Sequence, residues 1–421
     1  MVNHNATTVG DLFFVNHKVT TVGDLCLVNH KAATMFCKKN CDFGCFVFME
    51  NNFYDIYIPK DYTYIYYMAN IILTGGGTAG HCTPNIALIP FLKKDFDNIY
   101  YVGSEHGIEK KIVTENGIPY YDIPCAKLTR KFTAKNLSIP FKVLSGVRKA
   151  EKLIDKLRPD VIFSKGGYVA VPLVLAAKNK KIPVISHESD LSVGLANRFT
   201  AKYCEKVLTS FKDTALTLKN GEYVGSPIRR DVFNADRKKS LDEFGFDGSK
   251  PVILVTGGSQ GAEAINNVLR ESLDVLLKKY DVLHVCGKGR LKPELSKKGY
   301  FQTEFLSAME KAFAVASVCV SRAGSNTVFE LLSLKIPTLL IPLPKGNSRG
   351  DQVENAKYFQ KQGLIHLLEQ DSLTPESLIL NINAVYSNRA NLIKNLEKNP
   401  VTDQSPRISK ILSDRAKRNN R

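Results

Sequence analysis

The sequence has no tryptophan, and none of its apolar runs approaches the ~18 residues needed to span a lipid bilayer. It also lacks a basic stretch followed by an apolar block and a small-residue cleavage site at its N-terminus, so we expect a cytoplasmic chain. The nine cysteines follow no regular framework, which argues against a disulfide-stapled scaffold and favours reduced thiols.

Two common nucleotide-binding motifs are absent as well. No glycine loop runs into G-K-[ST], and none has the G-x-G-x-x-G register with an acidic residue about 20 positions further on. No D-x-D pair is placed to bridge a diphosphate through Mg²⁺, so we expect neither a metal nor a cofactor. The net charge of +17 nevertheless predicts an anionic partner: nucleic acid, a phosphorylated substrate or an acidic membrane surface. Nucleic acid ranks last, because basic and aromatic residues interleave in no recognised binding module.

The first 67 residues differ in character from the rest. The segments VNHNATTVGDLFF, VNHKVTTVGDLCL and VNHKAAT begin at residues 2, 15 and 28, so the 13-residue period repeats almost letter for letter. Structural repeats diverge except at key positions, and near-identity therefore indicates a recent tandem duplication. We expect residues 1–67 to be a non-native or disordered extension, with the working chain starting at Met68.

From Met68 onward, short β-rich apolar runs alternate with helix-length amphipathic segments, which is typical of parallel βαβ units. Two series of runs each open with a strand that leads into glycines, ILTGGGTAGH and ILVTGGSQGA. We predict an α/β chain of two doubly wound, Rossmann-like domains that face each other across a cleft, with ligands beyond the carboxyl ends of the strands. The expected strands are 70–74, 98–102, 160–163, 182–186 and 204–208, then 251–255, 281–285, 316–320 and 337–341, with the domains joined near 222–233.

The first glycine loop predicts an anion site at a helix start. Gly75, Gly76, Gly77 and Gly80 let backbone N–H groups approach a phosphate, although a tight strand-to-helix turn explains the glycines as well. His81 follows at the helix N-terminus, where the macrodipole disfavours imidazolium. We therefore expect a neutral ring that can act as a general base, the alternative being a histidine that only caps the turn.

The second series offers two more anion sites. Ser259 is expected near a helix start, as an oxyanion ligand, as an N-cap or as both. Ser325, Asn326 and Thr327 present N–H groups at another helix start, and Glu330 follows about one turn later. A phosphate there and a carboxylate at ribose distance would hold a nucleoside diphosphate, because a carboxylate can accept from both ribose hydroxyls. For Glu330 the alternative is an exposed acid that complements the helix dipole.

Seven segments across residues 69–421 resemble the successive motifs of one family, in its order and spacing: GGGTAGHCTPNIAL, SKGGYVAVPLVLAA, HESDLSVGLANR, VGSPIR, TGGSQGA, SRAGSNTVFELL and PLPKGNSRGDQVENA. The family is the undecaprenyldiphospho-muramoylpentapeptide β-N-acetylglucosaminyltransferases of glycosyltransferase family 28. The resemblance implies a GT-B fold and inverting transfer of N-acetylglucosamine from UDP-N-acetylglucosamine to the C4 hydroxyl of the muramoyl sugar of lipid I. The implied product is lipid II of peptidoglycan synthesis. The resemblance also implies a peripheral protein on the anionic inner leaflet of the cell membrane, with other cell-wall synthesis proteins as candidate partners.

The resemblance also implies roles for individual residues. It places His81 at the reaction centre, with Glu188 as a residue that orients it; a structural carboxylate in a loop is an equal alternative for Glu188. Asp190 stands where several relatives carry Asn, so as a substrate contact it can only accept hydrogen bonds when ionised. The other implied contacts are Thr78, Ala79, Gly80, Arg229 and Ser259 for the donor and acceptor phosphates, Leu306 for uracil, Ser325, Asn326, Thr327, Val328, Phe329 and Glu330 for diphosphate and ribose, and Gln352 and Asn355 for the sugar.

A stretch at residues 127–152 mixes apolar and basic side chains. Such a mixture fits a patch that docks on anionic lipid, each cation contributing on the order of 1 kcal/mol. An ordinary amphipathic helix with a solvated basic face is the alternative, and a lipid-linked acceptor favours the patch. The predicted patch includes Leu137, Ile139, Phe141, Leu144, Lys131, Lys135 and Lys142.

We thus expect an extension at 1–67, an acceptor and membrane-facing domain at 68–224, a UDP-sugar domain at 225–404 and a basic helix at 405–421 that packs back on the first domain. Two rival functions fit the same architecture. A UDP-N-acetylglucosamine 2-epimerase would need acid and base residues on both faces of the sugar's C2, and a non-catalytic nucleotide-sugar-binding protein would bind UDP and turn nothing over.

Overall fold

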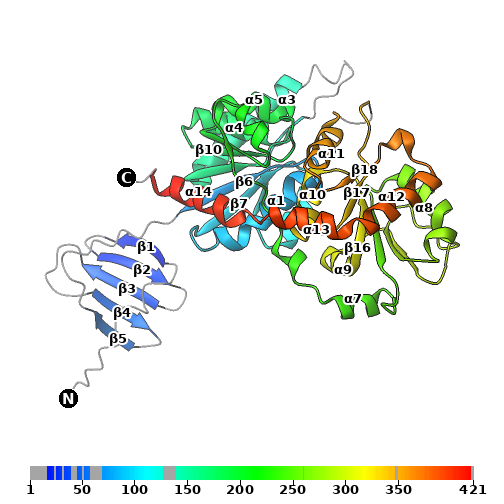
Figure 1. The fold of residues 1–421 in the computed structure, drawn as a ribbon. Helices are drawn as coiled ribbons and strands as arrows, with labels where there is room; N and C mark the ends of the chain where they lie inside the picture. Colours follow the sequence, from blue (N-terminus) through cyan, green and yellow to red (C-terminus); the bar gives the residue numbers. More distant parts are fainter. Residues whose placement is uncertain are drawn as a thin grey trace. The chain divides into compact units, whose positions relative to one another are not determined.

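The computed structural model describes residues 17–22, 25–30, 33–38, 45–49, 52–56, 69–126, 139–258, 260–346 and 349–418 (Figure 1). The chain divides into two compact units. One comprises Met1–Ala69 with Phe96–Asn98, and the other comprises Asn70–Asp95 with Ile99–Arg421.

In the first unit the described strands form an antiparallel sheet in the order β1-β2-β3-β4-β5. We had not expected this sheet, because the tandem repeat and the residues after it show no sustained alternation of apolar and polar side chains. Whether residues 1–67 belong to the working protein stays a prediction. The strands are β1 (His17–Val22), β2 (Leu25–His30), β3 (Ala33–Lys38), β4 (Cys45–Met49) and β5 (Asn52–Ile56).

The second unit begins with an α/β domain built on a seven-stranded sheet in the order β12-β11-β10-β9-β6-β7-β8. Parallel pairing joins β6 to β9, β9 to β10 and β10 to β11. The central strands are almost entirely buried, as runs of Val, Ile and Leu in parallel sheets usually are. Their bounds are β6 (Asn70–Thr74), β7 (Asn98–Gly103), β8 (Tyr120–Asp122), β9 (Val161–Ser164), β10 (Val184–Glu188), β11 (Lys206–Thr209) and β12 (Gly221–Tyr223).

Helices connect these strands, as expected for βαβ units. They are α1 (Ala79–Leu92), α2 (Ile108–Glu115), α3 (Ile139–Leu157), α4 (Ala170–Asn179), α5 (Leu195–Thr200), η3 (Ala201–Tyr203) and α6 (Lys212–Leu216). No helix among the residues described here is both long and apolar enough to cross a membrane.

A second α/β domain follows, with a six-stranded parallel sheet in the order β15-β14-β13-β16-β17-β18. Along its central strand, Val252 and Leu254 belong to one hydrophobic cluster while Ile253 and Val255 belong to another. Successive side chains therefore pack on opposite faces of a sheet that is covered on both sides. The strands are β13 (Val252–Thr256), β14 (Asp281–Val285), β15 (Tyr300–Thr303), β16 (Ala316–Ser321), β17 (Thr338–Leu340) and β18 (His366–Leu367).

The helices of this domain, and the last helix of the chain, complete the architecture. The last helix, α14 (Ser405–Arg418), packs against α1 and β9 of the first domain (Figure 1). There Arg415 forms an ion pair with Glu205. The remaining elements are η4 (Arg230–Phe233), α7 (Arg237–Glu243), α8 (Glu263–Leu276), α9 (Met309–Val315), α10 (Ser325–Ser333), α11 (Asp351–Lys361), η5 (Gln370–Ser372), α12 (Pro375–Ser387) and α13 (Arg389–Lys398).

Candidate active site

The glycine loop between β6 and α1 is fixed by the protein beneath it. The Tyr101 hydroxyl donates to the Gly75 carbonyl oxygen at 2.6 Å. Gly77 has φ +88°, and a Cβ at this position would lie 2.5 Å from the Tyr168 ring. Gly77 is therefore required both by its backbone conformation and by the close approach of an aromatic side chain.

A carboxylate of the protein occupies part of this loop. The Gly77 N–H donates to Glu109 of α2 at 3.3 Å, and the same carboxylate accepts from the Ser104 N–H at 3.1 Å and from the Ser104 hydroxyl. A Cβ at Gly76 would lie 2.5 Å from Glu109 Oε1. A Cβ at Gly75 would likewise lie 2.6 Å from the His81 carbonyl oxygen. Three of the four glycines thus have a structural explanation, and the segment from Thr78 to Gly80, where α1 begins, is the part left to face a ligand.

His81 is the third residue of α1 and is half-buried. Its ring packs against Gly167, since a Cβ added to Gly167 would lie 3.2 Å from His81 Cδ2. Its pKa is lowered from the ordinary value of 6.5, chiefly by burial and next by the Lys165 ammonium group. Arg349 lowers this pKa further, whereas Asp190 raises it. The pKa is lowered in the direction expected for a neutral ring, although the main causes are burial and a buried lysine rather than the helix dipole that the sequence suggested. The role of His81 as a base stays a prediction.

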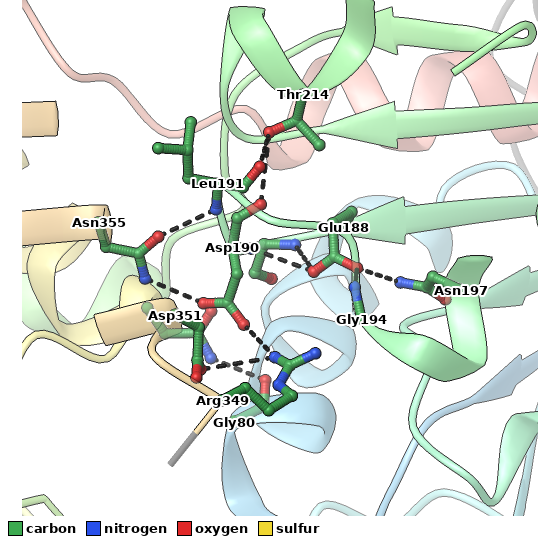
Figure 2. Close-up of polar contacts among 12 residues, drawn as sticks. Gly80, Glu188, Asp190, Leu191, Gly194, Asn197, Thr214, Arg349, Asp351 and Asn355 are labelled. Atoms are coloured by element: carbon green, nitrogen blue, oxygen red, sulfur yellow. Dashed lines mark hydrogen bonds and ion pairs between the residues drawn. The ribbon is translucent and has the colours of Figure 1, made fainter. Parts of the chain in front are cut away.

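Glu188 ends β10 and binds its own loop (Figure 2). Its carboxylate accepts from the N–H groups of Ser189, Asp190 and Gly194 at 2.9, 3.1 and 2.9 Å, and from Asn197 Nδ2 at 2.8 Å. These four donors favour the structural alternative for Glu188, a carboxylate that shapes the loop carrying Asp190. A role in orienting His81 stays a prediction.

Asp190 links this loop to α11 of the second domain (Figure 2). Its carboxylate accepts from Asn355 Nδ2 at 3.0 Å and from Arg349 Nη2 at 3.1 Å, and Asn355 Oδ1 in turn accepts from the Leu191 N–H at 2.9 Å. Asp190 and Asn355 were both predicted as substrate contacts. In the structure they bind each other, together with Arg349, which the sequence had not singled out.

The N-termini of α1 and α10 are joined by a hydrogen bond. Asn326 Nδ2 donates to the Gly80 carbonyl oxygen at 2.7 Å. Ser325 beside it is buried, and Thr327 is half-buried. Asn326 Oδ1 is also buried and has no hydrogen-bond partner within the described structure. Two positive helix ends are thus brought together, which favours binding of an anion between them.

Arg229 and Glu330, both predicted to contact the donor, form an ion pair. Arg229 Nε lies 3.2 Å from Glu330 Oε1, and Arg229 Nη1 lies 3.3 Å from Asp231 Oδ2. Burial raises the pKa of Glu330, and the Arg229 guanidinium opposes that rise. Only 12% of the Glu330 side chain is exposed, so it is not the exposed surface acid considered as its alternative.

Two predicted contacts lie in the core instead. Val328 and Phe329 are buried, and the Phe329 ring packs against Phe211 and Phe359 with centroids 5.4 and 5.5 Å away. Both residues belong to the apolar face of α10, which the helical period turns inward. Neither side chain is therefore free to contact a ligand, and a contact through their backbone atoms stays a prediction.

The remaining predicted contacts lie near the same end of the second sheet or outside the described residues. Leu306 is half-buried against the core cluster of this domain. Gln352 Oε1 accepts from the Leu343 N–H at 3.0 Å, a bond within the domain. Ser259 and the side chain of Ala79 lie outside the described residues, and α8 begins four positions after Ser259, at Glu263.

The predicted membrane patch falls on the start of α3. Phe141 and Leu144 are 76% and 48% exposed, and Lys142 is exposed beside them. Ile139 is half-buried. The other predicted members, Leu137, Lys131 and Lys135, lie outside the described residues.

Two parallel-sheet domains with helix N-termini at the ends of their strands define an α/β protein of the GT-B glycosyltransferase class. The chain belongs to glycosyltransferase family 28, whose N-terminal domain model matches residues 71–209 and whose C-terminal domain model matches residues 252–411. Among the described residues, no group of three or more His, Cys, Asp and Glu side chains is placed to hold a metal ion.

A curated relative from Clostridium tetani is 46% identical over 331 residues, which are 78% of this chain and 92% of that protein. It is named UDP-N-acetylglucosamine–N-acetylmuramyl-(pentapeptide) pyrophosphoryl-undecaprenol N-acetylglucosamine transferase. The crystal structure of Acinetobacter baumannii MurG aligns with a TM-score of 0.66 at 24% identity, over 82% of this chain and 99% of that one. A putative UDP-N-acetylglucosamine 2-epimerase from Listeria monocytogenes aligns with a TM-score of 0.58 at 12% identity, over 81% and 95%. The fold is common to both enzyme types, while the high sequence identity is to the transferase.

Proposed function

We propose that this protein transfers N-acetylglucosamine from UDP-N-acetylglucosamine to lipid I and so forms lipid II. The observation that carries the proposal is the bond from Asn326 to Gly80, which sets two helix N-termini together beside His81 in a chain closely related to named transferases of this kind. The first domain, residues 68–224, takes the acceptor, and the second, residues 225–404, takes the donor.

The donor diphosphate lies at the N-terminus of α10, with the ribose near Glu330. A carboxylate that already pairs with Arg229 can accept from the two ribose hydroxyls, and Arg229 stays close enough to offset the charge of the diphosphate. As the bond to the sugar breaks, negative charge develops on the departing UDP. The N–H groups at the ends of α1 and α10 are fixed in advance to stabilise that charge.

His81 is the base. Its lowered pKa leaves the ring neutral at pH 7, so it can take the proton from the C4 hydroxyl of the muramoyl sugar as that oxygen attacks the anomeric carbon. The attack comes from the face opposite UDP, and the new bond has the β configuration. As pH falls through the pKa of His81 the ring becomes protonated, so activity should fall on the acid side.

The acceptor is carried by a lipid, and the start of α3 is the surface we assign to the membrane. Phe141 and Leu144 offer exposed apolar side chains, and Lys142 offers a cation beside them. Exposed apolar groups flanked by cations bind anionic bilayers peripherally.

The test is a transfer assay with labelled UDP-N-acetylglucosamine and a lipid I analogue in detergent. We expect a labelled disaccharide product, a large loss of activity in His81→Ala, and none in the matched variant His106→Ala, because the His106 side chain is 88% exposed. Conversion of the donor alone into its C2 epimer would favour the epimerase. Binding of UDP with no turnover, whether or not the acceptor is present, would favour a non-catalytic nucleotide-sugar-binding protein.

A further inference from the structure

A lysine is buried beside the candidate base. Lys165 directly follows β9 and is 1% exposed. Its Nζ lies 2.7 Å from His187 Nδ1 and donates to Ser189 Oγ, and both partners come from the end of the neighbouring strand β10. Lysine side chains are rarely fully buried unless they are paired, so this position has a specific role.

The hydrogen bonds fix the protonation of the whole cluster. An ammonium group only donates, so His187 Nδ1 must accept from Lys165, which leaves the His187 Nε2–H to donate to the Gly225 carbonyl oxygen at 2.9 Å. Burial and the Lys165 charge lower the pKa of His187 well below its ordinary value, in agreement with a neutral ring. The positive charge of the cluster therefore resides on Lys165.

Lys165 and His81 lie on either side of the glycine loop. A Cβ at Gly75 would be 2.6 Å from the His81 carbonyl oxygen and 2.9 Å from Lys165 Cβ. The His81 ring in turn lies against Gly167, two residues after Lys165. The backbone that carries the lysine is thus packed directly against the helix turn that carries the histidine.

We propose that Lys165 is a positioning residue for His81. Its buried ammonium group is held in place by His187 and Ser189 and supplies a fixed positive charge near the imidazole. In that environment the imidazole accepts the proton of the acceptor hydroxyl. The inference rests on the proposed function, since it takes His81 as the base. The other charged groups that act on His81 are Asp190 and Arg349.

The charge of Lys165 is itself limited to a range of pH. Burial lowers the pKa of Lys165 to about 8, and the carboxylates of Glu188 and Asp190 oppose that shift. Below pH 8 the ammonium repels a proton on His81, so removing it should raise the pKa of His81. Above pH 8 the wild-type lysine has also lost its charge, so a neutral substitute should behave like the wild type there.

The variants for the test are Lys165→Met, which removes the charge at similar length, and Lys165→Arg, which keeps it. Lys94→Met, at an exposed position of the same domain, is the matched control. The full chain is labelled with ¹³C-histidine, and the His81 signal is assigned by its loss in His81→Gln. We expect Lys165→Met to raise the pKa of His81 by about one unit or more, as removal of one nearby charge does, and Lys165→Arg and Lys94→Met to leave it near the wild-type value.

The second readout is the pH profile of transfer. Lys165→Met should move the acid limb of kcat/KM to higher pH by the same amount as the His81 titration, so its loss should approach tenfold for a one-unit shift only at pH values well below the wild-type pKa of His81. It should converge with the wild type above pH 8. An equal loss at every pH would mean that Lys165 only supports the fold, and an unmoved His81 titration would overturn the proposal outright. A titration that moves while the transfer profile does not would show instead that His81 is not the base, so the proposed role of His81 would fail separately.

Should Lys165→Met not fold, Ser189→Ala gives an independent test. This variant removes one acceptor of the ammonium group, so Lys165 should lose its proton at a lower pH and the His81 titration should move in the same direction by a smaller amount. No movement in a folded Ser189→Ala chain would contradict the anchoring of the charge that we propose.

Discussion

Removal of the Glu330 carboxylate should weaken donor binding through the ribose. Glu330 lies 3.2 Å from Arg229 and is largely buried, so its hydrogen bonds to a ligand would be charge-assisted and poorly screened. Such a contact is worth about 1.5–3 kcal/mol, and its loss should raise the donor KM by roughly ten- to a hundredfold. Arg229 keeps Asp231 as a second partner, so we expect Glu330→Ala to remain folded with a free energy of unfolding only about 1 kcal/mol lower.

The assay compares UDP-N-acetylglucosamine with its 2′,3′-dideoxy analogue in the wild type, Glu330→Ala and Glu330→Gln. The analogue has no ribose hydroxyls for the carboxylate to accept from, so the mutation and the deletion of the hydroxyls should not add. Glu330→Gln keeps an oxygen acceptor and should lose less than Glu330→Ala. Equal losses with natural and dideoxy donors would refute the reasoning, because Glu330 would then act only through its pairing with Arg229.

Three further changes test other parts of the account. Asp190→Asn removes the carboxylate that raises the pKa of His81, so the acid limb of transfer should move to lower pH, and a shift to higher pH would contradict the assigned charges. Phe141→Ser should weaken binding to vesicles that contain anionic lipid by roughly ten- to a hundredfold in a flotation assay, since it removes an exposed apolar side chain worth roughly 1.5–3 kcal/mol when buried. Unchanged binding would mean that the membrane-binding surface lies elsewhere. Gly77→Ala should lower the free energy of unfolding more than Gly117→Ala, because both glycines have positive φ but, of the two, only Gly77 has a side chain in the space that a Cβ would fill. Equal effects of the two substitutions in denaturant melts would argue against the close packing of the glycine loop.

The interior of both sheets could be predicted from the sequence. Each of the nine expected strands is present within two residues of its expected bounds, because buried parallel strands are continuous apolar runs. In the two α/β domains the strands that were missed, β8, β12, β15 and β18, form the two edges of each sheet. Edge strands are short and half-buried, so their composition does not separate them from loops.

The site could be predicted where a motif is local and not where it depends on contacts between distant residues. The start of α10 and the position of His81 follow from short glycine-containing segments. Arg349 and its pairing with Asp190 span 159 positions, and no periodicity in one sequence reports such a contact.

Lys165 had one usable signal. A lysine at the end of the run VIFS, just before two glycines, is a charge where the strand pattern predicts burial. Glu109, buried against the glycine loop, had no such signal, because an acid in the first turn of a helix is ordinary.

The central claim is tested most directly by the identity of the product formed by the full chain from UDP-N-acetylglucosamine and a lipid I analogue. The account predicts an acceptor that carries one additional N-acetylglucosamine in β linkage to the muramoyl C4 oxygen, with one UDP released for each sugar transferred and no donor consumed when the acceptor is omitted. Formation of a C2 epimer from the donor alone, or the absence of any disaccharide product in every detergent tried, would contradict it.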